Sequence, residues 1–513
     1  MTTEKNNSKS RIICIGLFIV YAVLTLICAS RHELWFDEAQ AWTIARDNTI
    51  GGIFKQLRYE GHPPMWYLIL YVFSHLGFEC SVAPIISWFF TSIAAAIVMF
   101  KAPFSIPVKA ILIFSGGFLF FNSAMTRTYC LMNVLLVLIA MLFSKRKEHP
   151  VIFGILVALL ANTHVCISGF IGAMGLIMLH DIYSDWKTNP AKKNALNLTG
   201  LAIAGIGVLM LIIPLIGSLS ANNMTAEKTI TLKSCLNSFG ESFHNISMHL
   251  LGAYRYAPYM LAGIIAVFFV AMLILMRHKT RPFFILILSC LFYIITTEIV
   301  WFSNPNRAHI LVLIFFVAMW IAETEPENKA SEIWKKLSLE KTSKLIQKLV
   351  EAVKKCDTNF TGTYKVILST ILVLSIPVAV SYFGRDCTQT FSIAKETADY
   401  VKANLPEDSV FVMRNSMQAQ IAAYLPGYKF YSIEDEQFVT YVTHNKVDKI
   451  SYDKVYNDLK DYPNLYIINV NLDINAIESN RNIVHVNRGG IVFGTNACYI
   501  EISTLDPEME FNP

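Results

Sequence analysis

The sequence predicts a polytopic α-helical membrane protein followed by a small C-terminal α/β domain, and three observations lead to this fold class. Of the 513 residues, 54% are hydrophobic and 16% are charged, whereas about a quarter of the residues of an average soluble protein are charged. Apolar runs that approach the roughly 20 residues needed to cross a bilayer recur between residues 12 and 383. After residue 384 the composition becomes that of a soluble protein.

The apolar runs and the basic clusters between them predict the topology. The runs lie at 12–30, 64–78, 82–100, 109–125, 129–143, 151–180, 198–218, 258–276, 283–300, 308–322 and 364–383. Lys and Arg are enriched in cytoplasmic loops, so we expect all basic clusters to lie on the cytoplasmic side. This is possible only if the run 64–78 does not cross the membrane and the run 151–180 crosses it twice, with a break near Asn162. The result is about 11 spans in the cell membrane, with the N-terminus cytoplasmic and the C-terminal domain extracytoplasmic.

Four regions follow from this topology: a transmembrane module at 1–322, a charged amphipathic connector at 323–363, a last transmembrane helix at 364–384, and an extracytoplasmic α/β domain at 385–513. In that domain, the side-chain pattern predicts strands at 409–413, 429–432 and 465–470 and helices at 390–404, 415–424 and 452–461. Their alternation predicts a partly parallel sheet. The acidic run Glu434-Asp435-Glu436 is expected to form a solvated turn.

Charge and cysteine usage exclude several classes of protein. The net charge of +5 comes from short basic clusters between apolar runs, and no basic stripe with interleaved aromatic residues indicates nucleic-acid binding. The ten cysteines form no CxxC pair, so neither a zinc site nor a disulfide scaffold is predicted.

The loop after the first apolar run carries the main candidate site. It begins with WFDEAQAW, which contains Asp37 and Glu38, and ends with EGHPPMWY, which contains Glu60 and His62. Ionisable residues at a membrane surface are functional candidates because burying charge there is costly. The alternative is that the first two acids are the N-terminal charges of a helix starting at Ala39.

These motifs, together with four later features, resemble the GT-C glycosyltransferases that use polyprenyl-phosphate sugars, especially the family of the protein O-mannosyltransferases and the bacterial aminoarabinose transferase. The later features are Arg127 and Tyr129 in SAMTRTYCL, Thr163-His164, Asn306-Arg307, and the short run 64–78, which matches a juxtamembrane helix of that fold. The resemblance covers residues 12–322. It implies a membrane enzyme that moves a sugar from a polyprenyl-phosphate donor to an extracytoplasmic glycan, lipid or protein acceptor.

Such a transfer requires a carboxylate to take the acceptor's proton and cations to stabilise the departing phosphate. The resemblance places the catalytic acid at Asp37, with Glu38 as the next candidate or as a residue that holds a helix or orients a cation. Single displacement opposite the phosphate would invert the anomeric centre. Arg127, Arg307 and His62 are the candidate phosphate ligands, against a simple interfacial role for the arginines.

Three further residues are candidates for contact with the acceptor or the sugar: Glu60, Tyr129 and His164. Helix capping or membership of an interfacial aromatic belt is the structural alternative for the last two. His62 stands where related proteins carry Lys, so its charge depends on pH near about 6.5. No cofactor is expected, although Asp37 and Glu38 could bind a divalent metal; no DxD or ExD motif occurs in this loop.

Two other functions remain open at this stage. A transporter or lipid flippase would use the same acids for proton coupling, and would be supported by inverted repeats or Gly/Pro-broken helices in matching halves. A polysaccharide polymerase or ligase would use lipid-pyrophosphate donors. The sequence does not identify the sugar, the acceptor or the length of the lipid.

Overall fold

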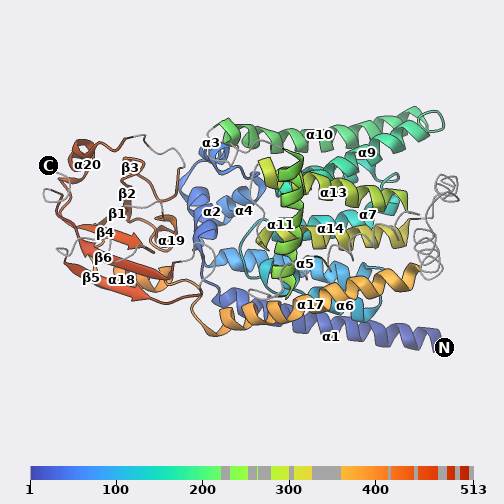
Figure 1. Cartoon of the computed structure of the whole chain (residues 1–513), viewed down its shortest axis with the longest axis horizontal. Coiled ribbons are helices and arrows are strands. Elements are labelled where there is room, and N and C mark those ends of the chain that lie inside the picture. The colour runs from blue at the N-terminus through green and yellow to red at the C-terminus, as the bar shows by residue number, and fades with distance from the viewer. Residues whose placement is uncertain are drawn as a thin grey trace. The chain divides into compact units, whose positions relative to one another are not determined.

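The computed structural model describes residues 2–220, 231–251, 263, 279–299, 305–325, 360–413, 417–443, 447, 449–471, 482–491 and 497–507. The expected span at 258–276, residue 263 apart, and residues 326–359 of the expected connector lie outside the described residues. The chain forms two compact units (Figure 1). We call them the helical unit (Met1–Thr25, Trp88–Ser123, Thr128–Ser381) and the loop and sheet unit (Leu26–Ser87, Ala124–Arg127, Tyr382–Pro513).

The borders of these two units differ from the domain borders expected at 322, 363 and 384. The first loop and the 124–127 turn group with the C-terminal residues rather than with the helices that precede and follow them in the chain. Three long helices, α1 (Thr2–Arg31), α5 (Val82–Lys101) and α17 (Phe360–Thr388), contribute to both units. The expected borders themselves stay predictions.

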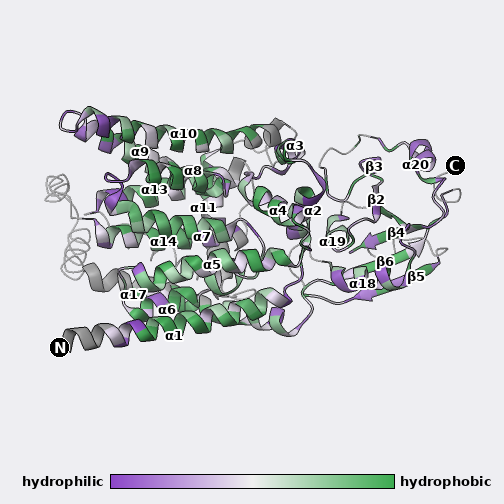
Figure 2. Cartoon of the chain, turned by 180° about the vertical axis from the view of Figure 1, so that it is seen from behind, coloured by the Kyte–Doolittle hydropathy of each residue, from purple (hydrophilic) through white to green (hydrophobic). Residues whose placement is uncertain are grey.

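The other helices of the helical unit are α6 (Ile106–Ile113), the π-helix η1 (Gly117–Phe121), α7 (Tyr129–Leu142), η2 (Phe143–Lys145), α8 (Pro150–Ala161), η3 (Val165–Ile167), α9 (Ser168–Asp185), α10 (Ala191–Ser220), α11 (Leu232–Leu251), α13 (Thr280–Ile299) and α14 (Pro305–Thr324). Helix α14 packs against α7 and α13 (Figure 1). Hydrophobic residues line most of α5, α7, α13 and α14 (Figure 2).

Within the described residues, five helical segments are long and apolar enough to cross a membrane: Ser8–Arg31, Val82–Lys101, Val165–Asp185, Ala191–Ile213 and Thr280–Thr297. The chain is therefore a multi-pass membrane protein, as its composition predicted. The expected number of spans and the orientation stay predictions.

Two expectations about individual runs agree with the structure. The run 151–180 is broken: α8 ends at Ala161, and His164 caps η3 by accepting the Cys166 backbone N–H at 3.1 Å. The run 64–78 contains α4 (Met65–His75), whose 11 residues extend roughly 16 Å at 1.5 Å per residue, well short of the roughly 30 Å of a hydrocarbon core. Helix α4 is too short to cross by itself.

The run 109–125 is not one continuous helix. Helix α6 ends at Ile113, and a π-helix follows at Gly117–Phe121. Phe114, Ser115 and Gly116 separate the two, and Gly and Ser weaken a helix interior because they favour other backbone conformations. This interruption has no signal in the hydropathy of the run.

Small residues let α8 and α10 pack closely. A Cβ on Gly154 would lie 2.1 Å from the Gly200 carbonyl oxygen, and a Cβ on Gly200 would lie 2.2 Å from the Pro150 carbonyl oxygen. Such contacts are typical of membrane helices, in which van der Waals packing replaces the hydrophobic driving force.

A buried ionic cluster joins four segments of the helical unit. Arg146 donates to Asp181 Oδ2 through Nε at 2.7 Å and to Glu325 Oε1 through Nη1 at 2.9 Å. Arg281 pairs with both of the same carboxylates. Arg146, Asp181 and Glu325 are all buried. Arg146 and Arg281 belong to two of the basic clusters that predicted the topology, at 145–147 and 277–281, so these clusters contain residues with specific acidic partners.

The loop and sheet unit contains α2 (Phe36–Asp47), α3 (Ile50–Glu60), α4, α18 (Ala394–Asn404), α19 (Ala419–Ala422), α20 (Tyr452–Leu459), β1 (Val410–Met413), β2 (Lys429–Ser432), β3 (Gln437–Phe438), β4 (Leu465–Val470), β5 (Ile483–Arg488) and β6 (Tyr499–Thr504). The strand order is β3-β2-β1-β4-β6-β5. Strand β1 is parallel to β2 and β4, and the other pairs are antiparallel. The partly parallel sheet is confirmed; β3, β5 and β6 were not predicted.

The expected solvated turn at 434–436 is wrong for two of its three residues. Asp435 and Glu436 are each only 7% exposed. Asp435 accepts hydrogen bonds from Ser432 Oγ at 2.8 Å and Thr443 Oγ1 at 2.6 Å. Glu436, at φ 46°, accepts the Ser451 backbone N–H. Hydrogen-bond donors from Ser432, Thr443 and Ser451 replace water, and this cannot be read from the acidic run alone.

The expected topology makes a direct prediction. A cysteine at the exposed position Lys55 of α3 should react with an impermeant maleimide in intact cells, because the first loop is expected outside. A cysteine at the exposed position Glu148, in the α7–α8 connection, should react only after permeabilisation. The parent protein gives the background from native cysteines. Labelling of position 148 in intact cells would reverse the orientation.

Candidate functional site

Helix α2 begins at the first acidic residues of the loop. It starts at Phe36 rather than at Ala39, so Asp37 and Glu38 both lie in its first turn. Negative charge there is favourable because the helix N-terminus carries a partial positive charge. Glu38, at the third helical position, accepts the Trp35 backbone N–H at 3.0 Å, which is the glutamate half of a capping box. Glu38 therefore has the structural role considered as the alternative for these acids, that of an acidic residue that stabilises the N-terminus of a helix.

Asp37 forms an ion pair with Arg127 from the 124–127 turn. The Asp37 side chain is 37% exposed and the Arg127 side chain 13% exposed. The guanidinium also lies over the Trp35 ring, 5.9 Å from its centroid, within the range of a cation–π contact. A partly solvated carboxylate and a cation held on an aromatic face are thus in direct contact.

Glu38 points into the protein and is 1% exposed. Its Oε1 accepts the Thr126 backbone N–H at 2.6 Å, and its Oε2 accepts the Trp35 N–H and contacts His32 Nε2 at 3.0 Å. Both oxygens are engaged inside the protein. Of the two adjacent acids, Asp37 is the one that has access to solvent.

Glu60 ends α3 and is 7% exposed. Its Oε1 accepts Gln40 Nε2 at 2.7 Å and Gln56 Nε2 at 3.5 Å. Both amides also donate to the Val442 carbonyl, and Gln40 Oε1 accepts the Val442 N–H at 2.9 Å. The backbone of the segment after β3 is therefore hydrogen-bonded to glutamine side chains of the first loop, and Glu60 belongs to the same contact.

The chain turns sharply between Glu60 and α4. Gly61 caps α3 in the left-handed conformation at φ 65°, where glycine meets no steric penalty. His62 follows it, half-buried, before Pro63 and Pro64. Burial, followed by the charge of Glu60, raises the pKa of the nearby Tyr67 well above its ordinary value. The Tyr67 hydroxyl therefore keeps its proton and can donate a hydrogen bond.

The remaining candidate residues belong to the helical unit. The Tyr129 ring lies 5.4 Å from the ring of His164 and 5.0 Å from that of His309, between centroids. Arg307 is 8% exposed in the first turn of α14, which contacts η3. Tyr129, His164 and His309 thus form one buried group, and the expected role of Arg307 stays a prediction.

Several residues of the loop site were not predicted from the sequence: His32, Asp386, Gln40, Val442 and the hydroxyl of Tyr67. His32 offered one signal, because it lies between Arg31 and Glu33 directly after the first span. The other four become visible only once distant segments are brought together.

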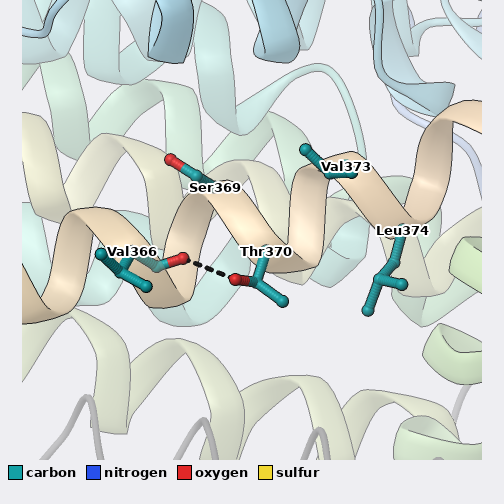
Figure 3. Close-up of a pocket in the computed structure, with 5 residues that line it drawn as sticks. All are labelled: Val366, Ser369, Thr370, Val373 and Leu374. Carbon is teal, nitrogen blue, oxygen red and sulfur yellow. Dashed lines mark hydrogen bonds between the residues drawn. The ribbon is translucent and has the colours of Figure 1, made fainter.

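Within the described residues, neither a metal-binding cluster nor the groove along α17 adds to this site. Among the described residues, no group of three or more His, Cys, Asp or Glu could hold a metal ion. A groove of about 390 Å³ follows α17 and is lined by Val366, Ser369, Thr370, Val373 and Leu374 (Figure 3). The Thr370 hydroxyl donates to the Val366 carbonyl at 2.8 Å (Figure 3). With no titratable side chain, the groove is not a candidate for chemistry.

The sequence predicted a GT-C-like fold, in which an α-helical membrane module is followed by a small α/β domain. Solved structures confirm the fold. ArnT from Cupriavidus metallidurans in the apo state aligns with a TM-score of 0.54 at 11% identity, and ArnT bound to undecaprenyl phosphate aligns with a TM-score of 0.51 at 10% identity. Each alignment covers 95% of this chain and 97% of the other. No protein-family model and no curated protein matches the sequence.

Proposed function

We propose that this protein is a membrane glycosyltransferase that moves a sugar from a polyprenyl-phosphate donor to an extracytoplasmic glycan, lipid or protein, with inversion. The observation that carries the proposal is the ion pair between Asp37 of the first loop and Arg127 of the 124–127 turn, in a fold shared with ArnT. The ArnT structure with bound undecaprenyl phosphate supports a polyprenyl phosphate as the lipid. Orientation of this loop toward the outside is part of the proposal.

In the proposed reaction the acceptor's hydroxyl or amine attacks the anomeric carbon. The bond from that carbon to the phosphate oxygen breaks, the acceptor's proton passes to Asp37, and the polyprenyl phosphate leaves with its new charge stabilised by Arg127. Arg suits this role because its planar donors match phosphate oxygens. Atoms and charge balance without a cofactor or a metal ion.

The ion pair also predicts an order of events. In-line displacement places the base and the leaving phosphate on opposite faces of the sugar, so Asp37 and Arg127 cannot remain in direct contact during transfer. The donor phosphate competes for the guanidinium, and its arrival releases Asp37 to accept a proton. Until the donor binds, Asp37 and Arg127 pair with each other and neither takes part in catalysis.

The other candidate residues have supporting roles in the proposal. His62 and Arg307 contact the donor phosphate, and Glu60, Tyr129 and His164 contact the sugar or acceptor. Glu60 is also structural, because it accepts hydrogen bonds from two glutamine amides.

Purified protein should be incubated with undecaprenyl phosphates and, separately, undecaprenyl pyrophosphates that carry different radiolabelled sugars, together with cell-envelope fractions. The same lipids should be tested for movement across proteoliposomes that contain the protein. Transfer of label from one donor to an envelope component is expected, with release of undecaprenyl phosphate. Lipid movement across proteoliposomes without transfer from any donor would instead establish the transporter, and transfer only from lipid pyrophosphates would establish the polymerase or ligase.

Arg127→Ala should reduce transfer roughly tenfold to a hundredfold, because a hydrogen bond to a charged group contributes about 1.5–3 kcal/mol. Arg127→Lys should recover only part of the rate, since an ammonium lacks the planar fork. Initial rates at several donor concentrations measure both effects. Arg46→Ala, which removes another Asp-paired arginine of the same unit, is the control; equal losses at Arg46 and Arg127 would contradict a specific phosphate role.

A further inference from the structure

His32 lies directly after the first span and is buried between two carboxylates. Its Nδ1 is 2.9 Å from Asp386 Oδ2, and its Nε2 is 3.0 Å from Glu38 Oε2. The side chains of all three residues are 0% exposed. Asp386 comes from the last turns of α17, so the contact joins two segments 354 positions apart in the sequence.

The charges of this group determine how it can act. Burial lowers the pKa of His32, but the charges of Asp386 and Glu38 together raise it by more, so that it lies well above its ordinary value. A carboxylate at each ring nitrogen favours the protonated ring, in which each nitrogen donates a hydrogen bond to one carboxylate. Charge-assisted bonds of this kind are short and directional, and removing one partner leaves a buried charge unpaired.

The contact continues from Glu38 to the turn that carries Arg127. Glu38 Oε1 accepts the Thr126 N–H at 2.6 Å, and the adjacent residues Asp37 and Arg127 form the ion pair. Two neighbouring residues of α2 thus bind two neighbouring residues of the turn. The orientation of Glu38 fixes where this turn lies against the helix.

We infer that His32 and Asp386 are positioning residues for the proposed sugar transfer: through Glu38 they hold the 124–127 turn so that Arg127 stays aligned with Asp37. The inference rests on the proposed function for its catalytic consequence but not for the structural linkage. It assigns Glu38 to positioning rather than to proton transfer. It also makes the end of α17 part of the machinery, although none of its residues need touch a substrate.

Hydrogen exchange tests the linkage without relying on activity. In the full-length protein, His32→Gln and Asp386→Asn should each speed exchange of the Thr126 amide roughly tenfold to a hundredfold, since its charged acceptor loses its anchor. Arg385→Gln, which changes the exposed neighbour of Asp386, should leave the exchange of that amide unchanged. Should a single variant fail to fold, the double variant His32→Phe/Asp386→Leu removes the buried His32–Asp386 pair as a whole. Glu38 then keeps only its backbone donors, and Thr126 protection should still weaken.

Kinetics supply the second arm. His32→Gln should lower kcat, and its effect should not add to that of Arg127→Lys, because both disturb the same alignment. The inference would be overturned if Thr126 exchange were unchanged, or if the losses of kcat in the His32→Gln/Arg127→Lys double variant were strictly additive. If the wild-type protein transfers no sugar but Thr126 exchange responds as described, the proposed function fails while the positioning linkage stands.

Discussion

Asp37→Asn should reduce sugar transfer by roughly 10²–10⁴-fold, the range expected when a general base is lost, while the protein stays folded and still binds the lipid donor. Asparagine preserves size and hydrogen bonding but cannot take a proton. It is also a good residue near a helix N-terminus, so loss of helix stability cannot explain a large effect. Single-turnover transfer with saturating donor measures the chemical step directly.

Asp47→Asn is the matched control for this prediction. Asp47 lies at the other end of α2 and is also paired with an arginine, Arg46. Its replacement removes the same charge from the same helix, and transfer should stay within about threefold of wild type, in keeping with the small effects of surface changes. Retention of more than about a tenth of the transfer rate by Asp37→Asn, above the general-base range, would move the base elsewhere, with Glu38 and Glu60 next to test.

Arg146→Met should destabilise the protein by about 3–5 kcal/mol, the cost of removing one partner from a buried ion pair. The change leaves Asp181 and Glu325 with Arg281 as a shared partner, and removes the guanidinium that lies 4.4 Å from the centroid of the Phe143 ring. The free energy of unfolding in mild detergent, from denaturant titration, measures the effect.

Lys145→Met is the matched control, because Lys145 is the exposed neighbour of Arg146 and its loss removes the same charge from the same basic cluster. Its effect on the free energy of unfolding should be within about 0.5 kcal/mol. If both variants unfold alike, this cluster serves membrane orientation rather than stability.

The roles of Asp37 and Glu38 could be predicted only in part from the local sequence. The sequence placed Asp37 and Glu38 together at the start of a helix, because first-turn acids and capping are local effects. It could not separate their roles. That separation depends on His32, Thr126 and Asp386, which supply partners to Glu38 and leave Asp37 to Arg127. Hydrogen bonds between distant segments have no counterpart in the hydropathy or spacing of either segment.

By itself the sequence determined most of the apolar helices that the structure describes, that the run 151–180 breaks near Asn162, and that β1, β2 and β4 alternate with helices. Each of these depends on side-chain periodicity or turn chemistry within a few residues. Only the tertiary structure decided that the first loop packs with the C-terminal residues and that Asp435 is buried. The physical reason is that burial and pairing of polar groups are set by partners from elsewhere in the chain.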